Sequence, residues 1–481
     1  MRVMFAVYAA KTHFYNMVPL AWALRAAGHE VCVATQPDIV DAVAATGLTA
    51  VAVGEETEVV EPAEAAARGD HVTSAGTWQS INAGMTETRP EELTWDYVLG
   101  AFTVACTMHY EHLTGGRSMM DGLVEFARYW EPDLVVWDAL SYAGPVAAVA
   151  AGAAHARILF GLDYIGRMYT RYEALLAEQA AERRDDVVAD WVTSRLSRFG
   201  RAPESAQDVR ELMTGQWTID PTPPWMRFPV DLPYQSVRYV PFNGPTTVPD
   251  WIHRDGHRRR VCLTLGMTAR ENLGGDLFAI DELIDALASL DIELIATLDE
   301  AQLDAVGTLP DNVRAVDFVP LNELLPTCSV IIHHGGFGTL GNAMVHGVRN
   351  LIVPGRYWDE IGFGELLEAR GAGGYIDPYR LSGDALKSKL PVDAFRAKVA
   401  TLLDDPSFAH NAMVMRDELR AVPSPHDIVP QLEELTATHR SGRRGKPCQR
   451  TTGPGRTSSS PVDSASSART SRRSSSPPVR A

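Results

Sequence analysis

Cysteine is scarce in this sequence, and its spacing excludes the site classes that depend on it. The five cysteines are Cys32, Cys106, Cys262, Cys328 and Cys448, and no two of them form a Cys-x-x-Cys pair. The sequence therefore predicts neither a disulfide framework nor a zinc knuckle.

Long apolar runs are absent as well. No stretch reaches the roughly 18 consecutive apolar residues that a membrane-spanning helix needs. The chain starts with a short apolar run that becomes polar at Lys11, Thr12 and His13, which indicates a first β-strand rather than a signal peptide. We therefore expect a cytoplasmic protein that does not bind a membrane.

Basic residues are outnumbered by acidic ones. The sequence has 44 Lys and Arg residues against 61 Asp and Glu residues, a formal net charge of −17. Nucleic-acid binding needs a basic surface that neutralises phosphates, so this balance argues against a nucleic-acid partner. The hydrophobic share of 45% is that of an ordinary globular protein.

An α/β rhythm is present in the first half of the chain. Apolar runs that predict strands alternate with helix-period segments, the first of which covers residues 18–27 and ends at Gly28. Strand, helix, glycine stop and strand is the pattern of a βαβ unit with a parallel sheet. The predicted strands cover residues 2–8, 31–35, 133–137 and 156–160. An Ala-rich helix is predicted from about Gly144, and residues 165–225 are helix-rich.

The same rhythm restarts in the second half. Helices are predicted over residues 277–290 and after Gly338. The predicted strands cover residues 260–265, 292–297, 313–316, 329–333 and 351–354. The sequence therefore predicts an α/β protein with two Rossmann-like domains whose parallel sheets face each other across a cleft. Ligands of such sheets bind at the carboxyl ends of the strands, so this cleft is the expected site.

Composition shifts along the chain define the domain boundaries. We expect a first, acceptor-binding Rossmann-like domain over residues 1–225, a Pro-punctuated linker over 226–250, and a second, nucleotide-sugar-binding Rossmann-like domain over 251–420. A C-terminal helix over 421–440 is expected to pack back on the first domain. Residues 441–481 contain nine Lys or Arg residues against one acid, among Ser, Thr, Pro and Gly, and are expected to be a disordered basic tail.

Residues 329–342 combine an apolar strand, a glycine-rich turn and the start of a helix. Glycines let backbone amides approach an anion, and a helix N-terminus offers unpaired N–H donors at the positive end of the helix dipole. His334 and Thr339 can add side-chain donors to those of Gly336 and Gly338. This arrangement suits a diphosphate.

Two other interpretations of this turn stay open. Gly336, Gly338 and Gly341 also match the G-x-G-x-x-G spacing of dinucleotide-binding proteins, which would make the chain an oxidoreductase. Against it, the following predicted strand ends in Pro354 rather than in an acid. The glycines could also be purely structural. His333 precedes His334 on a strand and so faces the other side, which predicts a core role for His333 rather than a shared metal.

The sequence resembles the antibiotic glycosyltransferases of actinomycete polyketide pathways, which glycosylate macrolides and anthracyclines. Six stretches, spread over roughly residues 1–438, carry the resemblance. They are residues 18–31, 132–137, 215–220, 263–266, 317–321 and the His-His-Gly-Gly-x-Gly-Thr element at 333–339. Each stretch is weak alone, and together they are highly specific.

The resemblance implies a GT-B fold and an inverting, metal-independent transfer of a deoxysugar. The donor would be a thymidine diphosphate (TDP) sugar, a co-substrate rather than a cofactor, and the acceptor a polyketide aglycone. Metal-dependent transferases of the other large fold class need an Asp-x-Asp element to hold a cation, and none stands out here. Several relatives also need a cytochrome-like auxiliary protein, so such a partner is expected.

The resemblance also assigns donor-binding residues, all of them in the second half. Val319 would meet the base, Leu325 would pack nearby, and Asp359 and Glu360 occupy the place where many relatives have an Asp-Gln pair contacting the sugar. Glu360 departs from that pattern. The residues implied to hold or face the diphosphate are Gly266, Met267, Thr268, Arg270, His334, Gly335, Gly336, Gly338 and Thr339.

A catalytic pair is predicted at the carboxyl ends of two strands. An alcohol that attacks an anomeric carbon must lose its proton, and a His oriented by a carboxylate is the natural base. His13 follows the first strand and Asp138 follows the strand at 133–137, where the family places its base and orienting acid. The alternatives are a capping His with a loop Asp, and a non-catalytic protein that only binds sugar nucleotides.

Aromatic side chains of the first half are candidates for an apolar acceptor pocket, although each taken singly is more often a core residue. The candidates are Trp78, Trp95, Tyr97, Phe102, Met108 and Tyr110, with Tyr164, Met168, Tyr169 and Tyr172 as a possible cap or partner surface.

Overall fold

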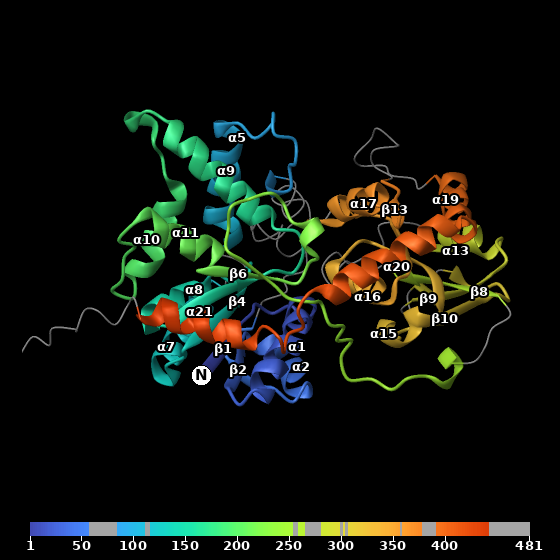
Figure 1. The fold of residues 1–481 in the computed structure, drawn as a ribbon, viewed down its shortest axis with the longest axis horizontal. Coiled ribbons are helices and arrows are strands. Elements are labelled where there is room, and N and C mark those ends of the chain that lie inside the picture. Colours follow the sequence, from blue (N-terminus) through green and yellow to red (C-terminus); the bar gives the residue numbers. More distant parts are fainter. Residues whose placement is uncertain are drawn as a thin grey trace, which may run out of the picture. The chain divides into compact units, whose positions relative to one another are not determined.

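Two fully parallel sheets organise the chain, as the sequence predicts (Figure 1). The computed structural model describes residues 1–56, 84–110, 116–253, 258–264, 280–298, 302–303, 306–355, 358–377 and 391–441. Residues Met1–Arg443 form one compact unit that contains both sheets. The predicted tail lies outside the described residues.

The first sheet has the strand order β3-β2-β1-β4-β5-β6-β7. Its strands are β1 (Arg2–Ala6), β2 (Glu30–Thr35), β3 (Thr49–Ala52), β4 (Leu134–Asp138), β5 (Ala154–Ile158), β6 (Trp217–Asp220) and β7 (Tyr234–Ser236). The central strands β4 and β5 are buried at every residue. Strand β4 is a nearly continuous apolar run, as expected where helices cover both faces of a sheet, whereas β5 also buries His155 and Arg157.

The helices of this half are α1 (Lys11–Ala26), α2 (Val40–Ala45), α5 (Trp95–Val104), α7 (Gly116–Trp130), α8 (Ala143–Ala151), α9 (Tyr164–Glu178), α10 (Val187–Ser197) and α11 (Ala206–Thr214). A π-helical turn, η3 (Ala105–His109), continues α5. Short 3-10 turns cover η1 (Pro37–Ile39), η4 (Ala181–Arg183) and η5 (Pro224–Met226). Residue spacing along these helices buries one face of each against the sheet or against another helix.

The second sheet has the order β10-β9-β8-β11-β12-β13. Its strands are β8 (Arg259–Thr264), β9 (Ile292–Thr297), β10 (Val313–Val316), β11 (Cys328–His333), β12 (Arg349–Ile352) and β13 (Gly373–Tyr375). Its helices are α13 (Ile280–Ala288), α15 (Leu321–Leu324), α16 (Phe337–His346), α17 (Glu360–Ala369), α19 (Val392–Asp404) and α20 (Pro406–Ala421), with 3-10 turns η6 (Asp250–His253) and η7 (Leu325–Thr327).

Several element boundaries differ from the predicted ones. Helix α1 begins at Lys11 and not near Val18, so the stretch expected to be a polar turn is the first turn of the helix. Strands β3, β6, β7 and β13 were not predicted, and β7 lies inside the range expected to be a linker. These strands have at most four residues each and carry polar or glycine positions, which hides the strand period.

The last helix, α21 (Val429–Ser441), packs on the first sheet (Figure 1). Leu432 is fully buried in the core of β1, β2 and β4. Glu433 lies 3.0 Å from His29 Nε2, and Arg440 forms an ion pair with Asp133. The chain therefore returns to its first half after the second sheet is complete.

None of the helices within the described residues is long and apolar enough to cross a membrane. The four cysteines that the structure describes, Cys32, Cys106, Cys262 and Cys328, are free thiols.

Candidate active site

His13 and Asp138 meet at the carboxyl end of the first sheet. Strands β1 and β4 are neighbours in the sheet. Asp138 is the last residue of β4, and His13 lies in the first turn of α1, just past β1. The His13 Nδ1 atom is 2.8 Å from Asp138 Oδ2, so the predicted contact is present. The second carboxylate oxygen accepts the Leu140 amide at 2.9 Å, which fixes the orientation of the carboxylate.

Two aromatic rings contact the His13 imidazole. The Tyr8 ring centroid is 4.8 Å away, edge to face, and that of Phe160 is 4.2 Å away. The carboxylate is almost fully buried, whereas 13% of the His13 side chain is exposed. Burial and the nearby Asp138 carboxylate raise the pKa of Tyr8, so its phenol stays neutral. One ring nitrogen of His13 is thus anchored while the imidazole still reaches solvent.

The glycine-rich turn of the second sheet connects β11 to α16. Gly335 has φ +110°, a conformation that glycine adopts at no steric cost. A Cβ on Gly336 would lie 2.5 Å from His334 Nε2, so the His334 imidazole lies against the turn. The amides of Thr339 and Leu340 donate to the Gly336 carbonyl and start the helix. The preceding amides face the N-terminal end of the helix, where an anion is stabilised.

His333 supports this turn from the core, as predicted. It is fully buried, its Nδ1 accepts the Gly335 amide at 3.1 Å, and its Nε2 lies 3.1 Å from Asn350 Oδ1. The two bonds require a neutral ring with the proton on Nε2. Burial lowers the pKa of His333 to about 3, which agrees with that assignment.

Tyr239 fixes the start of α16, a role that sequence motifs did not indicate. Its hydroxyl donates to the Gly338 carbonyl at 3.1 Å and accepts from Asn342 Nδ2 at 3.3 Å. A Cβ on Gly341 would come within 2.6 Å of the Tyr239 ring, so this glycine allows the close contact. The phosphate-binding turn predicted from the sequence therefore rests on a side chain about one hundred residues earlier in the chain.

Asp359 and Glu360 lie at the start of α17, and both are buried. Asp359 Oδ2 accepts the Leu162 amide at 3.2 Å. Burial raises the pKa of Asp359 to about 8. Glu360 Oε2 accepts the Gly355 amide at 2.6 Å, so it closes the loop that follows β12.

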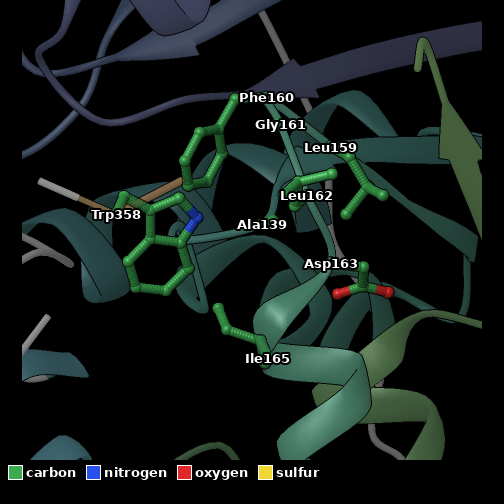
Figure 2. Close-up of a pocket in the computed structure, with 8 residues that line it drawn as sticks. All are labelled: Ala139, Leu159, Phe160, Gly161, Leu162, Asp163, Ile165 and Trp358. Atoms are coloured by element: carbon green, nitrogen blue, oxygen red, sulfur yellow. The ribbon is translucent and has the colours of Figure 1, made fainter. Parts of the chain in front are cut away.

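A small pocket is lined by Phe160, whose ring contacts His13, and by Trp358 (Figure 2). Trp358, which precedes Asp359, enters it with an unusual φ of +42°. Its ring lies 5.8 Å from that of Phe160 and 6.0 Å from that of Tyr164. The pocket is lined by Ala139, Leu159, Phe160, Gly161, Leu162, Asp163, Ile165 and Trp358. Neither Phe160 nor Trp358 carried a sequence signal.

The remaining predicted donor residues divide into two groups. Val319 and Leu325 are buried in one apolar cluster on the second sheet. Gly266, Met267, Thr268 and Arg270 lie outside the described residues.

The aromatic residues predicted as an acceptor pocket pack against each other in the core of the first half. Phe102 and Tyr110 are buried, and the Phe102 ring lies 5.0 Å from that of Tyr172. Tyr164, Met168 and Tyr169 are buried too, and Trp95 stacks on Tyr172. The structure therefore supports the core interpretation for these residues. Trp78 and the Met108 side chain lie outside the described part.

Metal ligands do not gather in the part of the chain that the structure describes. There, no group of three or more His, Cys, Asp or Glu side chains is placed to hold a metal ion.

Family models cover both sheets. A model described as "Erythromycin biosynthesis protein CIII-like, N-terminal domain" matches residues 22–266, and its C-terminal counterpart matches residues 281–435. Aclacinomycin-T 2-deoxy-L-fucose transferase of Streptomyces galilaeus is 50% identical over 445 residues, which cover 92% of this chain and 98% of that protein. 10-Deoxymethynolide desosaminyltransferase of Streptomyces venezuelae is 44% identical, with 92% and 98% covered.

Solved structures agree with the sequence comparisons. Glycosyltransferase VinC in complex with DTDP is 42% identical and superposes with a TM-score of 0.78, covering 91% of this chain and 100% of that one. Spinosyn forosaminyltransferase SpnP is 41% identical with a TM-score of 0.73, covering 91% and 99%. The predicted α/β architecture of GT-B type is therefore confirmed.

Proposed function

The chain belongs to the erythromycin biosynthesis protein CIII-like family of antibiotic glycosyltransferases, and from this we propose that it transfers a deoxysugar from a TDP-sugar to a hydroxyl group of a polyketide aglycone. The observation that carries the proposal is the 2.8 Å contact between His13 Nδ1 and Asp138 Oδ2 at the carboxyl end of the first sheet. The names of the relatives support the sugar and acceptor classes, since they include a 2-deoxy-L-fucose transferase and a desosaminyltransferase.

His13 is the general base of this proposal. The Nδ1–H group of His13 donates a hydrogen bond to the Asp138 carboxylate, which leaves Nε2 as the free basic nitrogen and stabilises the imidazolium that forms. The acceptor O–H bond breaks, its proton moves to Nε2, and the oxygen bonds to the anomeric carbon. The bond from that carbon to the diphosphate breaks in the same displacement, so TDP leaves and the anomeric configuration inverts.

The turn from His334 to Thr339 binds the diphosphate in this proposal. The first amides of α16 and the glycine backbone supply donors, and the positive end of the helix dipole stabilises the leaving group. The neutral His333 and the Tyr239 hydroxyl keep these amides in place through Gly335 and Gly338. Asp359 follows Trp358, which lines the small pocket, and in this proposal Asp359 contacts the donor sugar.

The transfer needs neither a divalent cation nor a further cofactor in this proposal, because fixed amide dipoles act on the diphosphate. The test is the initial rate of transfer in EDTA and in added Mg²⁺. Equal rates support the proposal, whereas a rate that EDTA abolishes and Mg²⁺ restores contradicts it.

The proposed reaction is tested by product analysis. The protein is incubated with a panel of TDP-deoxysugars and polyketide aglycones, with and without a cytochrome-like auxiliary protein, and the products are identified by mass spectrometry. An adduct heavier by one deoxysugar residue is the expected product, and its anomeric coupling in NMR reports inversion. No adduct with any pair, together with a thermal shift by NADH but not by TDP, would refute the proposal in favour of an oxidoreductase.

A further inference from the structure

The turn between β5 and α9, residues 159–163, contacts two parts of the candidate site, His13 and Asp359. Its Phe160 ring contacts the His13 imidazole at 4.2 Å. Its Leu162 amide donates to Asp359 Oδ2 at 3.2 Å. A Cβ on Gly161 would lie 1.7 Å from that same oxygen, so any other residue at this position would force the Asp359 carboxylate to move. The position of this turn therefore affects both His13 and Asp359.

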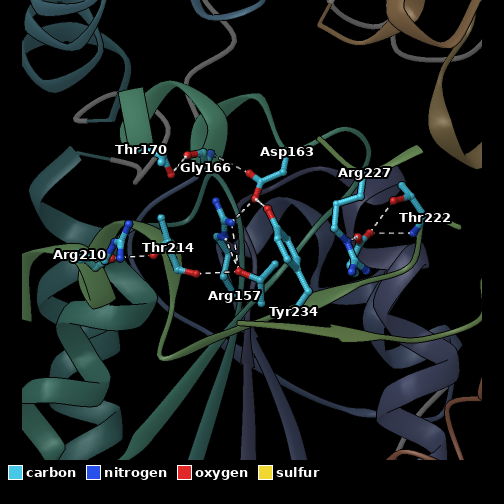
Figure 3. Close-up of polar contacts among 11 residues, drawn as sticks. Arg157, Asp163, Gly166, Thr170, Arg210, Thr214, Thr222, Arg227 and Tyr234 are labelled. Carbon is cyan, nitrogen blue, oxygen red and sulfur yellow. Dashed lines mark hydrogen bonds and ion pairs between the residues drawn. The ribbon is translucent and has the colours of Figure 1, made fainter. Parts of the chain in front are cut away.

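Asp163 ends the turn and is anchored by three donors (Figure 3). Its Oδ2 accepts from Arg157 Nη2 at 2.5 Å and from the Tyr234 hydroxyl at 2.7 Å. Its Oδ1 accepts the Gly166 amide at 2.8 Å, which caps helix α9. The Asp163 side chain is 3% exposed, so these bonds are shielded from water.

Two of the three donors come from strands of the first sheet, β5 and β7, and the third, Gly166, lies in helix α9. Arg157 lies on β5 and is fully buried, and its Nε and Nη2 donate to Thr218 Oγ1 on β6 at 3.3 and 3.1 Å. Tyr234 begins β7. Strands β5 and β7 thus each donate to the Asp163 carboxylate, and Thr218 on β6, which lies between them, holds the Arg157 guanidinium.

A buried ion pair is a weak source of stability, because the desolvation of both charges offsets their attraction. The hydrogen bonds within such a pair are directional, so they do fix the relative positions of the side chains that they join. Here they fix the end of a five-residue segment whose other end is held by strand β5. Phe160, in between, has little freedom to move away from His13.

We propose that Asp163, held by Arg157 and Tyr234, is a positioning residue that fixes the turn 159–163 and so keeps Phe160 against the His13 imidazole. The inference rests on the proposed function, since it needs His13 to be the base. Asp138 anchors one ring nitrogen, but the ring can still swing about that bond. The contacts with Phe160 and Tyr8 restrict the swing and keep the second nitrogen aimed at the acceptor hydroxyl.

Asp163→Asn is the first test. The single amide oxygen can replace Oδ1, which accepts from Gly166, or Oδ2, which accepts from Arg157 and Tyr234, but not both, and the charge pair with Arg157 is lost. We expect kcat to fall about tenfold to a hundredfold, as a displaced reacting group does, while KM for the TDP-sugar changes less than twofold. If Asp163 had a merely structural role, Asp163→Asn would lower the melting temperature but would not lower kcat selectively relative to KM.

Asp220→Asn is the matched control. Asp220 is also a buried carboxylate on this sheet, with Arg227 Nε at 2.8 Å and the Thr222 hydroxyl at 2.6 Å (Figure 3). It ends β6 and is not part of the 159–163 turn. We expect its kcat to stay within twofold of the wild type although its melting temperature falls.

A double-mutant cycle with Phe160→Ala shows whether Asp163 acts through Phe160. If it does, Asp163→Asn and Phe160→Ala together reduce kcat about as much as the stronger single variant, because the second change removes nothing further. Asp220→Asn and Phe160→Ala are expected to combine as independent changes. Multiplicative losses for the Asp163 pair would overturn the proposal.

Tyr234→Phe keeps the proposal testable if Asp163→Asn does not fold. It removes one donor to Asp163 and leaves the ion pair, so we expect a fall in kcat of a few fold that is again lost in the Phe160→Ala background. Unchanged kcat in every folded variant of Asp163 and Tyr234 refutes the positioning role while leaving the base untouched. Unchanged turnover in His13→Ala would instead refute the proposed function itself.

Discussion

Replacing Asp138 by Asn removes one negative charge and exchanges an acceptor oxygen for an NH2 donor, with almost no change in volume. The amide oxygen can keep the 2.9 Å bond from the Leu140 amide, which turns the amide nitrogen towards His13 Nδ1, now at 2.8 Å from a carboxylate oxygen. That nitrogen can only donate, so Nδ1 must accept and the His13 proton moves to Nε2. The base then carries a proton on the atom that has to receive one.

The expected loss follows from that tautomer. A positioned general base contributes about 10²–10⁴-fold to a rate, so we predict that Asp138→Asn lowers kcat by at least about 100-fold, or roughly 2.7 kcal/mol of transition-state stabilisation. The melting temperature and the affinity for TDP should stay close to the wild type because the fold and the second sheet are unchanged.

The assay is single-turnover transfer with saturating donor and acceptor, followed by quantification of the product, alongside calorimetric titration with TDP. Asp133→Asn is a suitable control, because Asp133 precedes the same strand at its opposite end and contacts Arg440. A kcat for Asp138→Asn within threefold of the wild type would refute the assignment of Asp138 as the orienting acid.

Three further predictions concern the second sheet and its supports. Gly335→Ala should lower the free energy of unfolding by about 1–3 kcal/mol, measured by denaturant titration, because φ is +110° there; an unchanged midpoint would contradict the strained turn. Asp359 holds its proton up to a pKa of about 8 in the fold but only up to about 4 when unfolded, so it stabilises the fold below pH 4 and this contribution is lost as pH rises towards 8. Asp359→Asn should therefore gain stability relative to the wild type between pH 5 and 8, and a constant difference across that range would contradict the shift. Tyr239→Phe should raise KM for the donor several-fold through Gly338, at a cost of about 1 kcal/mol, with kcat at saturation preserved; an unchanged KM would remove Tyr239 from donor binding.

Much of the fold could be predicted because local patterns agree with it. The apolar runs of β4 and β11 are strands buried on both faces, and both begin and end close to the predicted positions. The contact between His13 and Asp138 was also predictable, since both follow strands of one parallel sheet. His333 was expected in the core because neighbours on a strand face opposite sides, and the structure buries it.

Other features depend on contacts that a single sequence does not reveal. Helix α1 has no side-chain cap at Ala10, so no signal marked its start at Lys11. Strand β7 has only three residues and is fixed by its pairing with β6. Asp163 and Tyr239 belong to no motif, and each has a partner far away in the chain, Tyr234 for Asp163 and Gly338 for Tyr239.

The most direct test of the account is to compare His13→Ala with the wild type in both TDP binding and sugar transfer. The account predicts that the variant binds TDP with the wild-type affinity, since the diphosphate is held at the second sheet, and forms product at least about 100 times more slowly. Transfer at the wild-type rate by this variant would contradict the central claim that the His13 imidazole deprotonates the acceptor.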